Sequence, residues 1–149
     1  MRTRSWSPIA ILLVATLAAG AALAQPSTPT LYQRLGGYDA IAAVTDDFLG
    51  RLLSDAQFDR FFSGHSADSK ARIRQHIVDQ LCAATGGPCI YTGRGMKATH
   101  SGLGITEADW TRSVDHLTAS LDKFSVPAAE KGELLGIASS LKADIVEAP

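Results

Sequence analysis

Hydrophobic side chains recur every three or four residues along most of the chain, and no run alternates hydrophobic and polar residues as an exposed strand does. This spacing predicts amphipathic helices, because an α-helix completes one turn in about 3.6 residues. The long helices are expected over about residues 38–53, 68–85, 106–123 and 128–146. Their inward-facing residues are predicted to be Ile41, Val44, Phe48 and Leu52; Ile73, Ile77, Leu81 and Ala84; Trp110, Val114, Leu117 and Leu121; and Leu134, Ala138, Leu141 and Ile145.

Helix-breaking and helix-capping residues lie between these segments. Gly36-Gly37 precedes the first long helix, and Gly86-Gly87-Pro88 ends the second. Thr106 followed by Asp109 approximates a capping box, with Asp in the place of the usual Glu. Residues 55–63 are expected to form a short helical turn. The fold class predicted by this pattern is all-α.

One histidine lies in a short segment with glycines on both sides, in the sequence GMKATHSGLGIT at residues 95–106. The helical run between Gly95 and Gly102 is too short to be stable in isolation. It must therefore pack against something else, and His100 is the residue through which such a partner could attach.

The long helices pair naturally as two earlier and two later ones, with the segment around His100 between the pairs. Two helical pairs that cross over a gap enclose an interior space, and the interior of a helical bundle is a common cofactor site. The expected occupant is flat and apolar.

The N-terminus has the pattern of a secretory signal peptide over residues 1–24. Arg2 and Arg4 precede a hydrophobic stretch at residues 9–21, and Ala22-Leu23-Ala24 forms a small-x-small cleavage site. The hydrophobic stretch is short for a membrane span, although an uncleaved N-terminal anchor is the alternative. Export across the inner membrane to the periplasm is expected.

Residues 25–30 are expected to be a flexible lead-in, and residues 31–147 a single domain. Without residues 1–24 the chain has 125 residues, with 12 basic and 15 acidic side chains and a net charge near −3. Such a chain has no basic surface that stands out, which argues against nucleic acid as a partner. No membrane contact is expected once the signal peptide has been removed.

The cysteines, Cys82 and Cys89, lie seven residues apart. In an oxidising compartment they could form a disulfide, which the loop-entropy relation values at roughly 2.5 kcal/mol for so short a loop. The alternative is that Cys82 is a small buried thiol on the inner face of its helix. A zinc site is disfavoured, because the chain has neither a CxxC pair nor His-rich spacing.

Several short motifs, in this order along the chain, resemble those of group I truncated haemoglobins, the short globins with a two-over-two helical fold around a haem. The motifs are LYQRLGG at 31–37, FFSG at 61–64, ATGGP at 84–88, YTGRGMKATHSGLGIT at 91–106 and VP at 126–127. They cover nearly the whole chain after the signal peptide, so the ordered set is far more specific than any one glycine motif.

The resemblance implies that His100 is the proximal ligand of the iron of a haem b. A neutral imidazole binds iron through one nitrogen while its other N–H is oriented by a hydrogen bond. The iron–nitrogen bond and contacts with the haem would then stabilise the short helix. From spacing alone, a solvated histidine in a surface loop would be the simpler interpretation.

The resemblance also implies further contacts with the haem. Phe62 corresponds to a phenylalanine that stacks on the ring, and Met96 and Ile105 to apolar contacts on the proximal side. Tyr91, Arg94 and Lys97 lie where the family often meets the haem propionates, with freely solvated side chains as the alternative. Trp110, Val114 and Leu135 fit the helical core and the wall of the cavity equally well.

The expected distal pocket departs from the family pattern. Many group I members have a distal tyrosine and glutamine, but here the tyrosine position is Leu49, next to Phe48, and the helix positions that face the iron are Ile73 and Ile77, with Leu81 one turn on. This register assumes that a few extra residues lie in the loop near His65. A hydrogen bond to a charged acceptor is worth ~1.5–3 kcal/mol, so an apolar pocket predicts fast release of O2.

His76 lies at a position where some cyanobacterial members supply a second iron ligand. It precedes Ile77 and is rotated roughly 100° around the helix, so the simpler interpretation is a side chain that faces solvent or a propionate. The alternative is ligation of the sixth iron site. His65 and His116 are expected to be structural or solvated.

Three classes of function remain open. The first is a haem protein that reversibly binds O2, NO or CO, with an unknown reductant, as a monomer or weak dimer. The second is a haem enzyme, either an NO dioxygenase or a peroxidase-like enzyme, for which His76 is the sole candidate distal acid/base group; ligation by His76 would instead suit electron transfer or sensing. The third is a haem-free helical interaction module.

Overall fold

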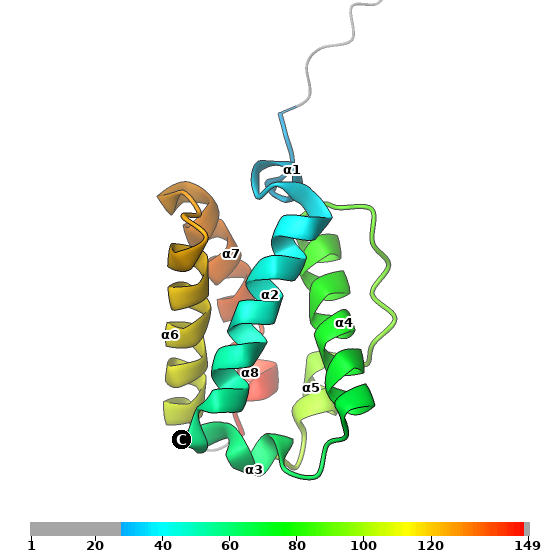
Figure 1. Cartoon of the computed structure of the whole chain (residues 1–149), viewed down its shortest axis with the longest axis vertical. Coiled ribbons are helices and arrows are strands. Elements are labelled where there is room, and N and C mark those ends of the chain that lie inside the picture. The colour runs from blue at the N-terminus through cyan, green and yellow to red at the C-terminus, as the bar shows by residue number, and fades with distance from the viewer. Residues whose placement is uncertain (1–27, 148–149) are drawn as a thin grey trace, which may run out of the picture.

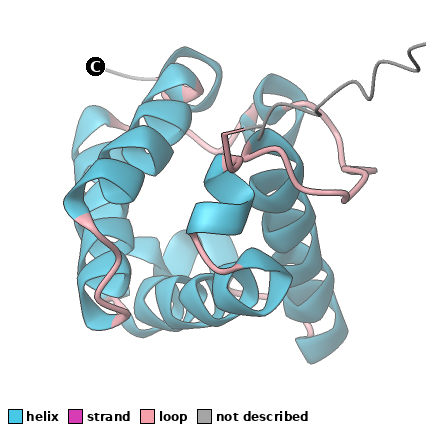
Figure 2. Ribbon diagram, turned by 90° about the horizontal axis from the view of Figure 1, so that it is seen from above, coloured by secondary structure: helices cyan, strands magenta, loops and turns pink. Residues whose placement is uncertain are grey.

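The computed structural model describes residues 28–147, and the predicted signal peptide lies outside them. The described residues form helices and connecting loops without a strand (Figure 2). None of these helices is both long enough and hydrophobic enough to cross a membrane. The elements are α1 (Leu31–Arg34), α2 (Gly37–Ser54), a 3₁₀ turn η1 (Ala56–Phe58), α3 (Asp59–Phe62), α4 (Ala67–Ala84), α5 (Met96–His100), α6 (Glu107–Lys123), α7 (Ala128–Ser140) and α8 (Lys142–Ile145).

The long helices form two pairs, as expected. In Figure 1, α2 lies between α4 on one side and α6 on the other, and both neighbours pack against it. Helix α7 packs on α6, while the short helices α5 and α8 lie side by side at the lower end of the bundle in that view. The result is an all-α, two-over-two arrangement.

The predicted helix boundaries agree with the structure to within a residue or two, except at the C-terminus. Thr106 and Asp109 form the predicted capping box: the Thr106 N–H donates to the Asp109 carboxylate at 2.9 Å, and the Asp109 N–H donates to Thr106 Oγ1 at 3.2 Å. The last helix was expected to continue through residue 146, but it is interrupted at Leu141, which ends α7 and precedes α8.

The core consists of two clusters that meet at α2. Ile41 and Ala42 pack against Val78 and Cys82 of α4. On the other side, Val44 packs against α6 and α7 through Leu117, Leu121 and Leu134.

The prediction for the inner face of α4 was wrong in part. Val78 and Cys82 are completely buried against α2, whereas Ile73, Ile77 and Leu81 are half-buried and Ala84 is exposed. Each fully buried residue directly follows a predicted one, which corresponds to a rotation of about 100° around the helix. The face of α4 that packs on α2 is therefore distinct from the apolar face beside it.

Cys82 and Cys89 form a disulfide, with their Cα atoms 5.7 Å apart. The bridge joins the end of α4 to the loop that leads to α5. Gly87 lies within this loop, and a Cβ atom there would meet the Tyr32 ring at 2.5 Å and the Cys82 sulfur at 2.7 Å. Only glycine fits at this position, where the chain turns tightly over the disulfide.

Candidate functional site

His100 is the last residue of α5 and is half-buried. Its Nδ1 atom lies 2.8 Å from the carbonyl oxygen of Met96, one turn earlier in the same helix. A carbonyl oxygen only accepts, so Nδ1 carries the proton of the neutral ring in this contact. The other ring nitrogen, Nε2, is then left with a free lone pair, which is the state that a metal ligand requires.

Contacts from distant parts of the chain hold the loop that follows His100. The carboxylate of Glu147 accepts hydrogen bonds from the backbone N–H groups of Gly102 and Gly104, both at 2.7 Å. Arg60, on α3, donates to the Gly104 carbonyl oxygen at 3.4 Å. Neither residue was singled out from the sequence, because a pairing across more than 40 residues leaves no local pattern.

The residues predicted for the distal side belong to α2 and α4. Leu49 is buried, and Phe48, Ile73, Ile77 and Leu81 are half-buried. Each of these side chains is hydrocarbon and supplies no hydrogen-bond donor. The half-buried side chains leave apolar surface on α2 and α4 that an apolar cofactor could cover.

Three separate segments carry the other residues predicted to contact the haem: Met96 and Ile105 on the proximal side, and Phe62, which was expected to stack on the ring. Ile105 is buried just before α6, while Met96 at the start of α5 and Phe62 at the end of α3 are half-buried. Trp110, Val114 and Leu135 are half-buried as well, on α6 and α7. Their burial is compatible with both interpretations of these three, as core or as cavity wall.

The residues predicted to meet propionates lie at the edge of the same region. The Tyr91 hydroxyl donates to the carbonyl oxygen of Arg94 at 2.7 Å, within its own loop. Arg94 and Lys97 are both exposed. Tyr91 and Arg94 precede α5 and Lys97 lies within it, but the Tyr91 hydroxyl already has a partner.

His76 is exposed on α4, and its ring packs edge-on against Tyr91, with the ring centroids 6.0 Å apart. In this position the imidazole contacts the loop before α5.

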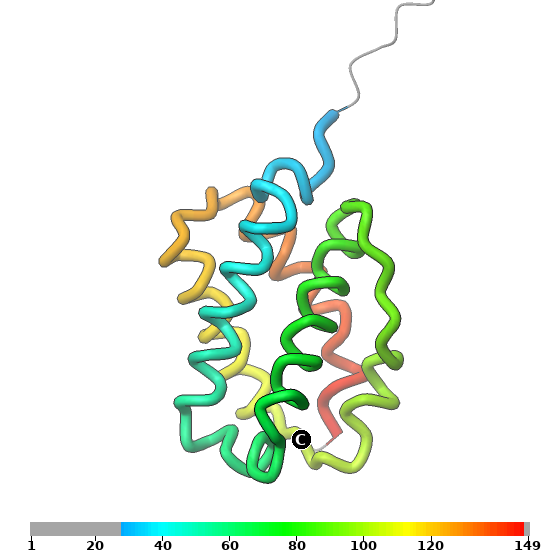
Figure 3. The backbone as a smooth tube through the Cα atoms, turned by 45° about the vertical axis from the view of Figure 1, so that its right-hand side comes forward, coloured from blue at the N-terminus to red at the C-terminus, as the bar shows by residue number. Residues whose placement is uncertain are grey.

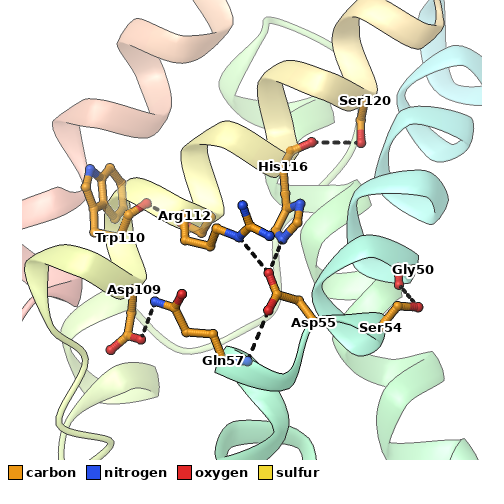
Figure 4. Close-up of polar contacts among 10 residues, drawn as sticks. Gly50, Ser54, Asp55, Gln57, Asp109, Trp110, Arg112, His116 and Ser120 are labelled. Atoms are coloured by element: carbon orange, nitrogen blue, oxygen red, sulfur yellow. Dashed lines mark hydrogen bonds and ion pairs between the residues drawn. The ribbon is translucent and has the colours of Figure 1, made fainter.

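A cluster of polar side chains connects α6 with the segment that follows α2 (Figure 4). Asp55 accepts from Arg112 Nε and lies against His116 Nε2, both at 2.7 Å. The hydrogen bonds from Arg112, Gln57 and His116 hold the pKa of Asp55 well below its ordinary value. His116, expected to be structural or solvated, is therefore structural.

Asp109 is the other acidic residue of this region, and it is buried. It accepts from Gln57 Nε2 at 3.0 Å and from Arg60 at 2.6 Å, in addition to its contacts with Thr106. Since Arg60 also reaches Gly104, the start of α6 is connected to the loop after His100.

Comparison with known proteins gives consistent matches over nearly the whole described chain. Residues 30–147 match the family model of bacterial-like globins. The chain is 35% identical over 122 residues to the group 1 truncated hemoglobin GlbN of Mycolicibacterium paratuberculosis, which covers 82% of this chain and 86% of that protein.

Solved structures of the same class resemble the fold. A variant of the truncated hemoglobin of Tetrahymena pyriformis, in its Fe(III) form, has a TM-score of 0.72 at 25% identity, covering 79% of this chain and 98% of that one. The 2/2 hemoglobin of Synechococcus sp. PCC 7002, with covalently attached heme, has a TM-score of 0.71 at 27% identity, with the same shares covered.

Proposed function

Because this chain belongs to the bacterial-like globin family and is related to the group 1 truncated haemoglobins, we propose that it reversibly binds a diatomic gas at a haem iron held by His100. The cofactor follows from the family: haem supplies the iron at which the gas binds. The residues of this chain hold the haem, orient the proximal imidazole and set the polarity around the gas.

The contact between His100 Nδ1 and the Met96 carbonyl oxygen is the observation that supports the proximal role most strongly. It selects the tautomer whose Nε2 atom binds iron, and it fixes the ring relative to α5. His65 and His76 are exposed, and His116 is paired with Asp55. Among the histidines of the described residues, His100 is therefore the one already prepared for ligation.

The distal side determines which gas is favoured. Leu49 and the isoleucines Ile73 and Ile77 offer no hydrogen bond to a bound gas, and bound O2 depends on such a bond more than CO or NO does. A hydrogen bond to a charged acceptor contributes ~1.5–3 kcal/mol, which corresponds to a roughly 10- to 150-fold change in the dissociation rate. The protein should therefore release O2 rapidly and suit NO or CO better than O2 storage.

Absorption spectra of the purified protein test this function. The oxidised, reduced and CO-bound forms should show a Soret band, with a reduced form that is five-coordinate and binds CO readily. A protein that gives no Soret band with added haemin would be a haem-free module, and the proposal would be wrong. An O2 dissociation rate as slow as that of tyrosine-bearing relatives would contradict the prediction of an apolar distal side, but not the binding of haem.

We also propose that the mature protein is exported after removal of residues 1–24. The hydrophobic N-terminal stretch motivates this, and the disulfide between Cys82 and Cys89 is compatible with an oxidising compartment such as the periplasm. Intact mass of the protein recovered from a periplasmic extract should correspond to a chain that begins at Gln25. Recovery of the full-length chain from the cytoplasm would refute export.

A further inference from the structure

The C-terminal segment returns to the loop that follows the proposed iron ligand. In Figure 3 the red C-terminal part of the chain runs beside the yellow-green segment around α5, and α5 and α8 are in contact. Glu147 makes this contact specific, because it bonds the loop through both its side chain and its backbone. One carboxylate oxygen accepts from the Gly102 N–H and the other from the Gly104 N–H, each at 2.7 Å, and the Glu147 N–H donates to the Ile105 carbonyl oxygen at 2.9 Å.

The loop needs such support because the helix before it is short and its glycines are conformationally free. Helix α5 has only five residues and no side-chain hydrogen bond at its N-cap, so it is far below the length at which a helix is stable alone. Gly102 and Gly104 both adopt left-handed backbone angles, with φ of +83° and +60°. Glycine loses more conformational freedom on folding than any other residue, and two hydrogen bonds to one carboxylate hold both glycines at once.

We propose that Glu147 is a positioning residue for His100: it holds the loop that follows the imidazole and brings a negative charge close to it. This inference rests on the proposed function, in which His100 binds the haem iron. The carboxylate accepts from the N–H groups of Gly102 and Gly104, two and four residues after His100, and these hydrogen bonds lower the pKa of its carboxyl. The carboxylate is therefore anionic at neutral pH and lies within the electrostatic reach of the ring.

Two consequences follow from this role, and the second distinguishes it from simple support of the fold. The geometric one is retention of haem, because a loop that is free to move lets the iron–nitrogen bond break more often. The electronic one is the strength of that bond, because a nearby anion makes the imidazole a stronger donor to iron.

The experiment uses the full-length, haem-loaded protein and three variants. Glu147→Ala removes both hydrogen bonds and the charge, while Glu147→Gln removes the charge and one hydrogen bond but keeps an acceptor oxygen for the other N–H. Asp144→Asn is the matched control, because Asp144 is an exposed carboxylate on α8. Haemin transfer to an excess of apomyoglobin gives the rate of haem loss, and resonance Raman spectra of the ferrous forms give the iron–histidine stretching band.

Glu147→Ala should lose haemin roughly two- to tenfold faster than the wild type, from the loss of hydrogen bonds of ordinary net strength. Its iron–histidine band should move to lower frequency. Glu147→Gln should show the same band shift with a smaller change in haemin loss, and Asp144→Asn should match the wild type in both measurements.

Bands at the wild-type frequency in both Glu147 variants would overturn the proposal, even if haemin were lost faster, because that pattern describes only structural support. If Glu147→Ala does not fold, the band of Glu147→Gln decides the question alone. A His100→Gly variant tests the underlying function separately: if it keeps the wild-type iron–histidine band, His100 is not the ligand, whatever the Glu147 variants show.

Discussion

Replacing Asp109 with asparagine should destabilise the protein by an amount that depends on pH. The carboxylate is 5% exposed and accepts hydrogen bonds from Gln57 at 3.0 Å, from Arg60 at 2.6 Å, and from the N–H and hydroxyl of Thr106 at 2.9 and 2.8 Å. Figure 4 shows the Gln57 contact. Asparagine keeps the shape but removes the charge, and its amide group places a donor opposite groups that also donate.

The magnitude follows from the pKa of Asp109. Burial raises this pKa, but the hydrogen bonds from Gln57 and Thr106 and the charge of Arg60 outweigh burial and lower it from 3.8 to about 2. The ionised carboxylate therefore contributes about 2 kcal/mol to the free energy of unfolding at pH 7. A depressed pKa stabilises the fold above pH 3.8, and this contribution falls as the pH drops towards 2, to about 1 kcal/mol at pH 3.

Urea unfolding of the haem-free protein, followed by far-UV circular dichroism at pH 7 and at pH 3, measures this difference. Asp109→Asn should lower the free energy of unfolding by about 2 kcal/mol at pH 7 and by about half as much at pH 3. Asp115→Asn is the control, because Asp115 is exposed on the same helix and should change stability by less than about 0.5 kcal/mol. An equal loss at both pH values, or no loss at pH 7, would refute the reasoning.

Three further results are expected. Leu49→Tyr places a hydroxyl on the distal side and should slow O2 dissociation roughly 10- to 150-fold in stopped-flow measurements; an unchanged rate would mean that residue 49 does not face the gas. His76→Ala should leave the ferric and ferrous absorption spectra unchanged, whereas loss of a six-coordinate spectrum would identify His76 as a ligand. Replacing both Cys82 and Cys89 with alanine should cost roughly 2.5 kcal/mol in urea unfolding, and a stability equal to that of the wild type would show that the bridge does not constrain the unfolded chain.

The helices could be predicted from the sequence because their signals are local. The capping pair of Thr106 and Asp109 and the glycines around α4 act on neighbouring residues, so the pattern alone gives the boundaries. The end of the last helix could not be predicted in this way. The break at Leu141 allows α8 to contact α5, and such a tertiary contact leaves no local sequence signal.

The face of α4 shows a limit of periodicity. Ile73, Ile77 and Leu81 form a regular hydrophobic stripe, yet the residues that are completely buried, Val78 and Cys82, lie on the adjacent face. Helix packing and cofactor contact both select hydrophobic residues, so a sequence pattern cannot separate them. Only the position of α2 distinguishes the two faces.

The ion pairs and hydrogen bonds around the site were not predictable for a different reason. Glu147 bonds residues more than 40 positions earlier, and Arg60 bonds Asp109 and Gly104 at similar separations. Each of these residues is an ordinary charged side chain in its local context. Their roles depend on which loops the fold brings together.

The most direct test of the central claim is the absorption spectrum of a His100→Gly variant, recorded in the ferrous form with and without added imidazole. The account predicts that the variant loses the five-coordinate histidine-ligated spectrum of the wild type and that exogenous imidazole restores it by filling the space left by the side chain. A variant that retains haem with the wild-type spectrum in the absence of imidazole would show that another residue holds the iron.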